Sequence, residues 1–344
     1  MQLTEREQEI LQTIVKEYIA SAEPVGSRTV AKHSRLKLSP ASMRNIMADL
    51  TEKGYLEQPH TSAGRIPSDI AFRFYVDSLL KLDPLSEQEQ QAIASFLSRA
   101  GLELSDILRQ ASKLLSSFSK QVSMVLAPQQ DVARWHQIDF IMVRPGLVMA
   151  IMVFQGGLVQ NKLVEVDKAT SADDLIRFSN YLNETFRGHT LSQVRRAVLR
   201  EIRHTRRRFN ALYRKAYSLM HQTLRTEDQP ELFVDGTLHI LNQPEFADMA
   251  SMRELLEILE ERSRLLELLD KVSTRQGATV VLGKELDWGE HKPWSMISSP
   301  YRSEDSTLGV VGIFGPMRMD YAKVLPVVDF TARILSQMLK NRFE

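Results

Sequence analysis

The chain contains no cysteine among its 344 residues. Structural disulfides, thiolate nucleophiles and metal sites built on thiolates are therefore excluded. Long apolar runs are also missing, because each one is interrupted well before it could span a membrane. The first residues, MQLTEREQEIL, are charged and contain no apolar signal core. We therefore expect a cytoplasmic protein with no membrane-spanning segment.

Motifs typical of enzymes are absent as well. The sequence has no Walker A motif, no GxGxxG and no GxSxG, and its eight histidines form no HxxxH pair or compact cluster with carboxylates. We predict no catalytic residue, no metal site and no bound cofactor. Among the histidines, only His60 lies in a segment with an expected function.

Charge of the two signs is nearly balanced, at a formal net +1, but it is unevenly distributed. Residues 25–48 include five basic side chains and no acidic one. Residues 191–225 include ten basic side chains and one acidic one, Glu201, whereas residues 252–270 lean acidic. Clustered basic side chains neutralise phosphates, so each basic stretch is a candidate nucleic-acid surface.

The Arg-rich run from Arg195 to Lys215 also has a second interpretation. Its arginines can form the solvated face of a helix that pairs with acidic residues elsewhere, such as Glu257, Glu260 and Glu261. A second nucleic-acid surface and a site for an acidic partner remain alternatives. The Leu-rich run LLEILEERSRLLELL is too short for a sustained coiled coil and favours a core or a dimer interface.

Three helices are predicted before Gly54. Thr4 and Glu7 have the spacing of a capping box, and apolar residues then recur at helical spacing. A second, short helix follows Pro24, with Ser27 as its expected N-cap. The basic side chains that this second helix directs outward, toward phosphates, are Arg28 and Lys32.

Ser39 and Pro40 favour the start of the third helix, because serine caps helix N-termini and proline is tolerated in the first turn. One stripe of this helix is apolar and is expected to face a small core. Its members are Met43, Ile46, Met47 and Leu50. Another stripe is polar, and Gly54 suits the C-terminal end.

The third helix has two interpretations. Its periodicity alone is equally typical of an ordinary amphipathic surface helix. The basic segment before it and the small polar loop after it favour a winged helix-turn-helix that binds DNA. In that case Arg44 can pair bidentately with guanine and Asn45 with adenine. The other candidate DNA contacts at the start of this helix are Ser39 and Ser42.

The loop after this helix, PHTSAGRIP, is small and polar and leaves no room for a core. A short strand at residues 55–56 leads into it, as expected of a wing. Arg65 in this flexible loop could enter a minor groove or hold a phosphate. The other side chains expected to contact DNA from the wing are His60, Thr61 and Ser62.

The rest of the chain mixes helices and strands without strict alternation, which indicates an α+β fold. An apolar helix near residues 72–80 and a linker, KLDPLSEQEQQ, precede a helix over 104–119 and a strand over 122–126. Three strand-like runs then lie between 138 and 166. Pro145-Gly146 and Gly156-Gly157 separate these runs, which predicts an antiparallel meander.

The last third continues in the same mixed style. Two or three helices are expected over 173–224, followed by a turn-rich connector, VDGTLHILNQPEF. The remaining expected elements are a helix over 252–272, strands at 279–282, 295–299 and 308–314, and a final helix over 321–343.

Taken together, these segments resemble the HrcA family, the bacterial heat-inducible transcription repressors. The resemblance rests on SPASMRNIMADLTEKGYLEQPHTSAGRIPS followed by FRFYVDSLL, and it is supported by DGTLHILNQPEF and LGVVGIFGPMRMDYAKVLPVVDF. It covers essentially the whole chain and is least distinctive over 127–224. One departure is Ile46, where the family pattern has an acidic residue.

The resemblance implies an architecture of three parts. An N-terminal winged helix-turn-helix would occupy residues 1–70, with a linker helix and linker over 71–100. A GAF-like α/β domain would comprise residues 101–135 and 225–344. An α+β dimerisation domain would be inserted into it over 136–224.

The resemblance also implies a homodimer that binds double-stranded DNA at an inverted-repeat operator, the CIRCE element, upstream of chaperone operons. The chaperonin GroEL would keep the repressor active until heat diverts the chaperonin to unfolded clients. The alternative is a regulator that senses a small molecule through the GAF-like domain. No motif supports such a ligand, and a fold alone does not define one.

Overall fold

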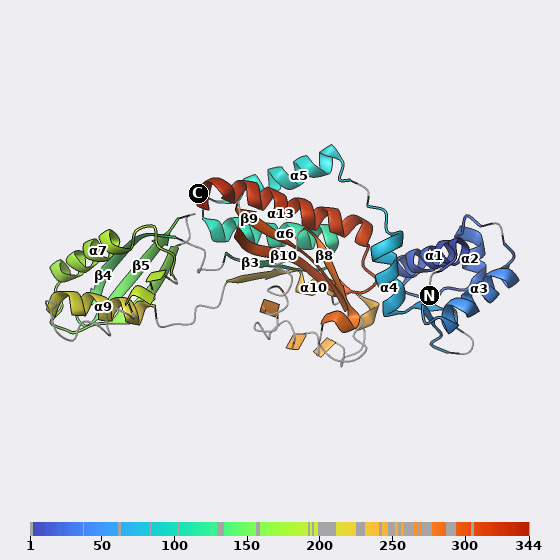
Figure 1. Ribbon diagram of the computed structural model, residues 1–344, viewed down its shortest axis with the longest axis horizontal. Coiled ribbons are helices and arrows are strands. Elements are labelled where there is room, and N and C mark those ends of the chain that lie inside the picture. Colours follow the sequence, from blue (N-terminus) through green and yellow to red (C-terminus); the bar gives the residue numbers. More distant parts are fainter. Residues whose placement is uncertain are drawn as a thin grey trace.

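The computed structural model combines helices and strands in an α+β arrangement, as the sequence predicts. Figure 1 shows three parts in a row, with the N-terminal part at one end and a green three-stranded sheet at the other. The structure describes residues 3–36, 38–60, 63–82, 84–101, 103–128, 134–155, 159–191, 193–194, 196–198, 211–224, 231–240, 243–246, 252–253, 256–257, 265–266, 269, 277–286, 294–303 and 306–343.

The N-terminal part, which we call the head, packs three helices against a short hairpin. Its elements are α1 (Glu5–Ser21), α2 (Ser27–His33), α3 (Pro40–Glu52), β1 (Leu56–Glu57) and β2 (Ile66–Pro67). The two strands pair antiparallel, and β1 begins one residue later than predicted. The helices enclose a core of side chains that are almost fully buried: Ile10, Leu11, Ile14, Val15, Val30, Met43 and Leu50.

The ends of these helices follow local capping chemistry. The capping box of Thr4 and Glu7 is confirmed, as is Ser39 as the N-cap of α3. The prediction of Ser27 as the N-cap of α2 is wrong, because Gly26 occupies that position and Ser27 is the first helical residue. Gly54 ends α3 with φ at +78°, and the N–H of Tyr55 returns to the carbonyl of Leu50 at 2.9 Å.

A helical segment connects the head to the central sheet. It comprises α4 (Asp69–Phe74) and a π-helical turn, η1 (Tyr75–Leu79). Arg73 on α4 donates from Nη2 to the carbonyl of Val280 at 3.0 Å and from Nε to Glu285 at 2.9 Å. The linker predicted over 81–91 is shorter than expected, because a second capping box starts α5 (Glu87–Ser98) inside it.

The central sheet is antiparallel with the strand order β7-β3-β10-β9-β8. The predicted strands are confirmed as β3 (Val122–Leu126), β8 (Thr279–Leu282), β9 (Trp294–Ser303) and β10 (Ser306–Pro316). The connector predicted over 234–246 is partly wrong, because β7 (Leu232–Asp235) extends into it and pairs with β3. Among the residues that the structure describes, this part also contains short helical segments: α10 (Thr237–Ile240), η2 (Pro244–Phe246) and η3 (Gly283–Leu286).

Two long helices cover one face of the central sheet (Figure 1). They are α6 (Leu104–Ser119) and α13 (Tyr321–Phe343), both with the predicted bounds. The apolar layer beneath them is continuous with the core of the head through Phe72 and Tyr75. The other face packs Trp294 and Phe314 against Leu269. The rest of the predicted helix over 252–272 lies mostly outside the described residues.

The third part, which we call the insert, has a separate hydrophobic core. The predicted meander is confirmed as an antiparallel sheet with the order β4-β5-β6. Its elements are β4 (Trp135–Arg144), β5 (Leu147–Phe154), β6 (Val159–Glu165), α7 (Ala172–Phe186) and α9 (Ala211–Thr223). Most of the Arg-rich run lies outside the described residues, as do the acidic partners Glu260 and Glu261. Within the described part of the chain, no helix is long and apolar enough to cross a membrane.

Candidate nucleic-acid interface

Helix α3 has one side in the core of the head and one side open to solvent. Arg44 and Asn45 are exposed in its N-terminal half. In helix-turn-helix proteins, the side chains that contact bases project from this part of the recognition helix. Both residues are therefore accessible to a nucleic acid. The apolar stripe faces inward as predicted, with Met43, Met47 and Leu50 buried and Ile46 partly covered.

Ser39 and Ser42 hold the start of α3 together. The Ser42 N–H donates to the Ser39 hydroxyl at 3.2 Å, and the two hydroxyl oxygens lie 3.1 Å apart. An N-cap of this kind stabilises a helix by about 1 kcal/mol. Both side chains thus have a structural role that fixes the backbone just before Arg44.

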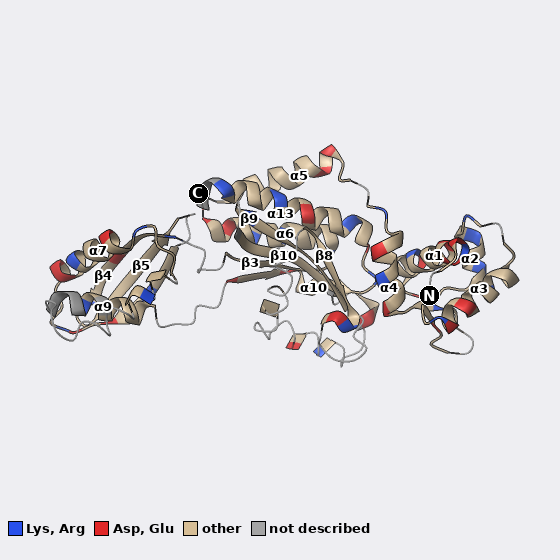
Figure 2. Ribbon diagram, viewed as in Figure 1, with Lys and Arg blue, Asp and Glu red and all other residues tan. Residues whose placement is uncertain are grey.

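The exposed cations of α2 lie beside this helix. Arg28 and Lys32 are one turn apart on α2, and neither forms an ion pair with any residue that the structure describes. The Glu17 carboxylate of α1 lies 2.7 Å from Nδ1 of His33, the last residue of α2. Figure 2 shows basic residues on α2 at one end of the molecule. Unpaired cations in this position can neutralise phosphates.

The hairpin residues that are predicted to contact DNA do not all lie in the free loop that the sequence predicts. His60 is exposed between the two strands, whereas Thr61 and Ser62 lie outside the described residues. Arg65 lies at the base of the hairpin rather than in a free loop. Its backbone N–H and carbonyl both pair with Val25 at 2.9 Å, and its Nε donates to the Thr51 hydroxyl at 3.1 Å. Arg65 therefore ties the hairpin to α3 and to the turn before α2.

Two small residues in the same segment have structural roles that sequence reasoning missed. A Cβ on Gly64 would lie 2.5 Å from the carbonyl oxygen of Val25, so only glycine allows this approach. The buried Ser68 hydroxyl donates to the Gly54 carbonyl at 2.7 Å and accepts the N–H of Ala71 at the start of α4. Gly64 and Ser68 of the string PHTSAGRIPS are the sequence features that indicate these roles. They fix the hairpin between α3 and α4.

A buried carboxylate connects α3 to α1. Glu7 accepts hydrogen bonds from Lys53, at the C-terminal end of α3, and from the Thr4 backbone at 2.8 Å. The hydrogen bond from Lys53 is the main reason why the pKa of Glu7 is lowered, and the Thr4 backbone adds to the effect. The ionised form of Glu7 is therefore favoured in the folded head.

Replacement of Glu7 by glutamine is expected to lower the stability of the head in a pH-dependent way. A lowered folded-state pKa adds stability that is complete above the ordinary value of 4.5 and is lost as the pH falls through the lowered pKa. The difference in unfolding free energy between wild type and Glu7→Gln should therefore shrink below that pH. Urea titrations from neutral to acidic pH measure it.

The control variant is Glu5→Gln, which removes an exposed carboxylate from the same first turn of α1. Its difference from wild type should be small and nearly independent of pH. A Glu7→Gln difference that stays constant down to the acid transition would contradict a role for the ionised Glu7.

The chain is similar to known proteins of one family along nearly its whole length. Residues 105–325 match the family model "HrcA protein C terminal domain". A heat-inducible transcription repressor HrcA of Nitratidesulfovibrio vulgaris is 48% identical over 99% of this chain and 97% of its own length. Its counterpart in Geobacter sulfurreducens is 43% identical over 98% of this chain and 99% of its own.

A solved structure shares the fold. The crystal structure of a hypothetical protein at 2.2 Å resolution superposes with a TM-score of 0.67, at 23% identity, over 99% of this chain and 100% of that one. The relatives define the class of protein as a transcriptional repressor of the heat-shock response and not an enzyme. The chain belongs to the HrcA family of heat-inducible transcription repressors.

Proposed function

We propose that the head is a winged helix-turn-helix that binds operator DNA, with α3 in the major groove and the β1–β2 hairpin as the wing. One observation carries this proposal. Helix α3 exposes Arg44 and Asn45, while α2 beside it exposes Arg28 and Lys32 without ion pairs among the described residues. Arginine and asparagine are the side chains that pair bidentately with guanine and adenine. The cations of α2 supply affinity that does not depend on sequence.

The wing would contribute contacts to the DNA backbone or minor groove. Nε of Arg65 is bonded to Thr51, but its two terminal nitrogens have no partner among the described residues and can hold a phosphate. His60 is exposed at the outer part of the hairpin. Thr61 and Ser62 complete this proposed set, together with Ser39 and Ser42 at the start of α3.

The division between base contacts and phosphate contacts can be tested by two substitutions. Asn45→Ala is expected to weaken specific operator binding by about 1–3 kcal/mol and to leave non-specific binding nearly unchanged. Lys32→Ala should weaken both kinds of binding and reduce the salt slope by about one unit. Gel-shift titrations across a salt series measure both quantities.

Equal losses on operator and non-operator DNA from both substitutions would overturn this division. Lys113→Ala is a suitable control, because Lys113 is an exposed lysine on α6, outside the head. It should leave both affinities and the salt slope unchanged.

The rest of the chain would pair two heads and support them. We assign residues 71–100 to the linker, 101–135 and 225–344 to a GAF-like domain, and 136–224 to an inserted dimerisation domain. The separate core of the insert supports this division. One sheet face of the insert leaves apolar side chains 51–56% exposed, namely Ile141, Val143, Val159 and Leu163. A second copy of the same face would cover them and form a homodimer.

Family membership supports the biological part of the proposal. A two-fold dimer presents two recognition helices to the two halves of a palindrome, as an inverted-repeat CIRCE operator requires. GroEL would maintain the active protein in the cytoplasm until heat diverts the chaperonin. Footprinting upstream of chaperone genes, with and without GroEL, tests both parts. Two symmetric protected half-sites are expected, and a single asymmetric footprint would contradict the dimer.

A further inference from the structure

The segments α4 and η1, which connect the head to the central sheet, are bonded to the head. Gln12 of α1 donates from Nε2 to the carbonyl of Leu79, the last residue of η1, at 2.7 Å. The hydroxyl of Ser68, the N-cap of α4, donates to the carbonyl of Gly54 at 2.7 Å. The head, α4 and η1 therefore form one unit. The contacts between α4 and the central sheet then set the direction in which this unit projects.

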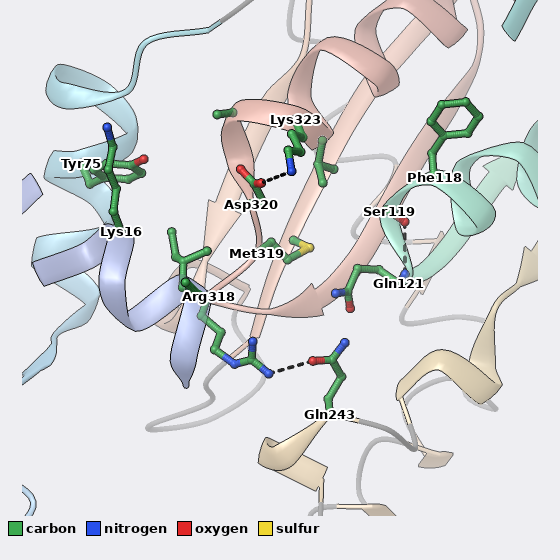
Figure 3. A pocket seen from close by; sticks show the side chains of 14 residues that line it. Lys16, Tyr75, Phe118, Ser119, Gln121, Gln243, Arg318, Met319, Asp320 and Lys323 are labelled. Carbon is green, nitrogen blue, oxygen red and sulfur yellow. Dashed lines mark hydrogen bonds and ion pairs between the residues drawn. The ribbon is translucent and has the colours of Figure 1, made fainter. Parts of the chain in front are cut away.

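Apolar packing alone does not set that direction. A cavity of about 540 Å³ separates the head from the central part along α1 and η1. In Figure 3, Lys16 and Tyr75 lie on the head side of this cavity, and Arg318 lies on the other side, where the chain leads into α13. Phe72 and Tyr75 do join the two cores, but apolar attraction is not directional. Directional contacts are therefore needed to fix the head.

Arg73, near the end of α4, supplies such contacts at the edge strand of the central sheet. Its Nη2 donates to the carbonyl of Val280 in β8 at 3.0 Å, and its Nε donates to Glu285 in η3 at 2.9 Å. Its Nη1 lies 3.3 Å from the Asp77 carboxylate in η1. All three guanidinium nitrogens thus have partners on different elements. Because a guanidinium is planar, this set of bonds permits one orientation of the group.

The corner between β8 and η3 that receives Arg73 is itself fixed and closely fitted to α4. Glu285 accepts the N–H of Leu282 at 3.1 Å. Gly283 turns this corner with φ at +43°, and a Cβ there would lie 2.6 Å from Oδ2 of Asp69 in the first turn of α4. Asp69 and Arg73 are four residues apart and so lie on the same side of α4. Both ends of α4 therefore meet this corner.

We propose that Arg73 is a positioning residue whose bonds to Val280 and Glu285 fix the direction in which the head projects from the central sheet. In a dimer, this direction sets the distance and the rotation between the two copies of α3. It therefore sets the separation of operator half-sites that the protein accepts. This second step rests on the proposed function, whereas the first step does not, so the two steps are measured separately.

The first step can be measured without DNA. The chain contains no cysteine, so Glu5→Cys on α1 and Lys113→Cys on α6 place spin labels at two exposed positions only. Double electron–electron resonance on labelled chain, diluted with an excess of unlabelled chain, measures the distance between the two labels within one subunit. The distance distribution should be narrow with Arg73 present. It should be about twofold wider with Arg73→Met, which removes the bonds that restrict hinge movement.

The matched control is Arg333→Met, because Arg333 is paired with Asp329 at 3.2 Å within α13, away from the head. It should leave the distribution unchanged. Arg73→Lys keeps the charge without the planar fork and should give an intermediate width. Glu285→Met removes the same ion pair from the central side, so it should also widen the distribution and add little to Arg73→Met. Equal widths for Arg73→Met and the wild type would overturn the proposal.

The second step is measured by gel shifts with three duplexes. They carry the inverted repeat that footprinting defines, the same repeat with two base pairs inserted between its halves, and one half-site alone. The insertion turns one half-site by roughly 70° relative to the other. It should weaken binding of the wild type by about tenfold or more and that of Arg73→Met by about threefold or less. Both should bind the single half-site equally, because α3 is unchanged.

An Arg73→Met variant that prefers the original spacing as strongly as the wild type does would overturn the second step. Weaker binding of this variant to the single half-site would also overturn it, because the head itself would then be damaged. Absence of operator binding by the wild type would instead overturn the proposed function. The widths of the distance distributions would still decide whether Arg73 fixes the head.

Discussion

Replacement of Leu163 by aspartate is expected to convert the proposed homodimer to a monomer and to lower operator affinity by about 100-fold or more. Leu163 is 56% exposed in β6, on the face of the sheet that turns away from α7 and α9. It pairs across the sheet with Met149, which pairs with Ile141. These three side chains form one apolar row across all three strands. A charge in the middle of a face that a second copy covers would be buried without a partner.

The alternation of side chains along β5 shows that the insert sheet is apolar on both of its faces. In β5, buried Val148, Ala150 and Met152 face the helices, while the residues between them are only partly covered. Strands with one solvated face normally carry polar residues there. Continuous apolar strands are typical of sheets that are covered on both faces. The insert covers one face with its own helices, and the second copy is the proposed cover of the other.

The matched control for this prediction is Ile176→Asp. Ile176 is 58% exposed on α7, also in the insert but outside the sheet. It should leave the dimer and the operator affinity intact. Sedimentation equilibrium measures the oligomeric state, and gel shifts at fixed salt measure affinity. A dimer of Leu163→Asp with unchanged dissociation constant would exclude this face as the interface. Because Leu163 is exposed in the single chain, the variant should keep its helical content.

The sequence predicts those elements that have strong local signals. The helix bounds of α6 and α13 and the positions of β3 and β8 follow from periodicity between turn residues. The sequence does not predict strand β7, because this strand is four residues long and lies at an edge of the sheet. Its conformation depends on pairing with β3, more than 100 positions earlier in the chain. Its last two residues, Val234 and Asp235, lie in the turn-rich connector, where the local pattern predicts a loop.

The candidate site was predictable to a similar degree. The exposure of Arg44 and Asn45 follows from helical periodicity once the apolar stripe of α3 is recognised. The position of Arg65 does not follow from any local pattern. It depends on pairing with Val25 and on the Thr51 hydroxyl, and both contacts need the folded head.

Replacement of Gly309 by alanine is expected to destabilise the central sheet by about 3 kcal/mol or more. Gly309 follows a register shift in β10 and lies directly opposite Tyr301. A Cβ at this position would come closer than 3.0 Å to the carbonyl oxygen of Leu126 and to the hydroxyl of Tyr301. Those two groups are bonded to each other at 2.6 Å in a fully buried position. The methyl group would force them apart and break the buried hydrogen bond that the Tyr301 hydroxyl donates.

Gly312 provides a control within the same strand, since a Cβ there would meet its nearest neighbours, among them Ile297 and Leu269, at 3.4 Å or more. That separation is ordinary van der Waals contact, so Gly312→Ala should change stability by about 1 kcal/mol or less. Urea unfolding of both variants, followed by far-UV circular dichroism, measures the difference. Equal urea midpoints for the two variants would show that the sheet accommodates a methyl group at Gly309. A selective loss at Gly309 would assign the first glycine of the LGVVGIFGP string to the buried contact between Tyr301 and Leu126, which ties β9 to β3 across β10.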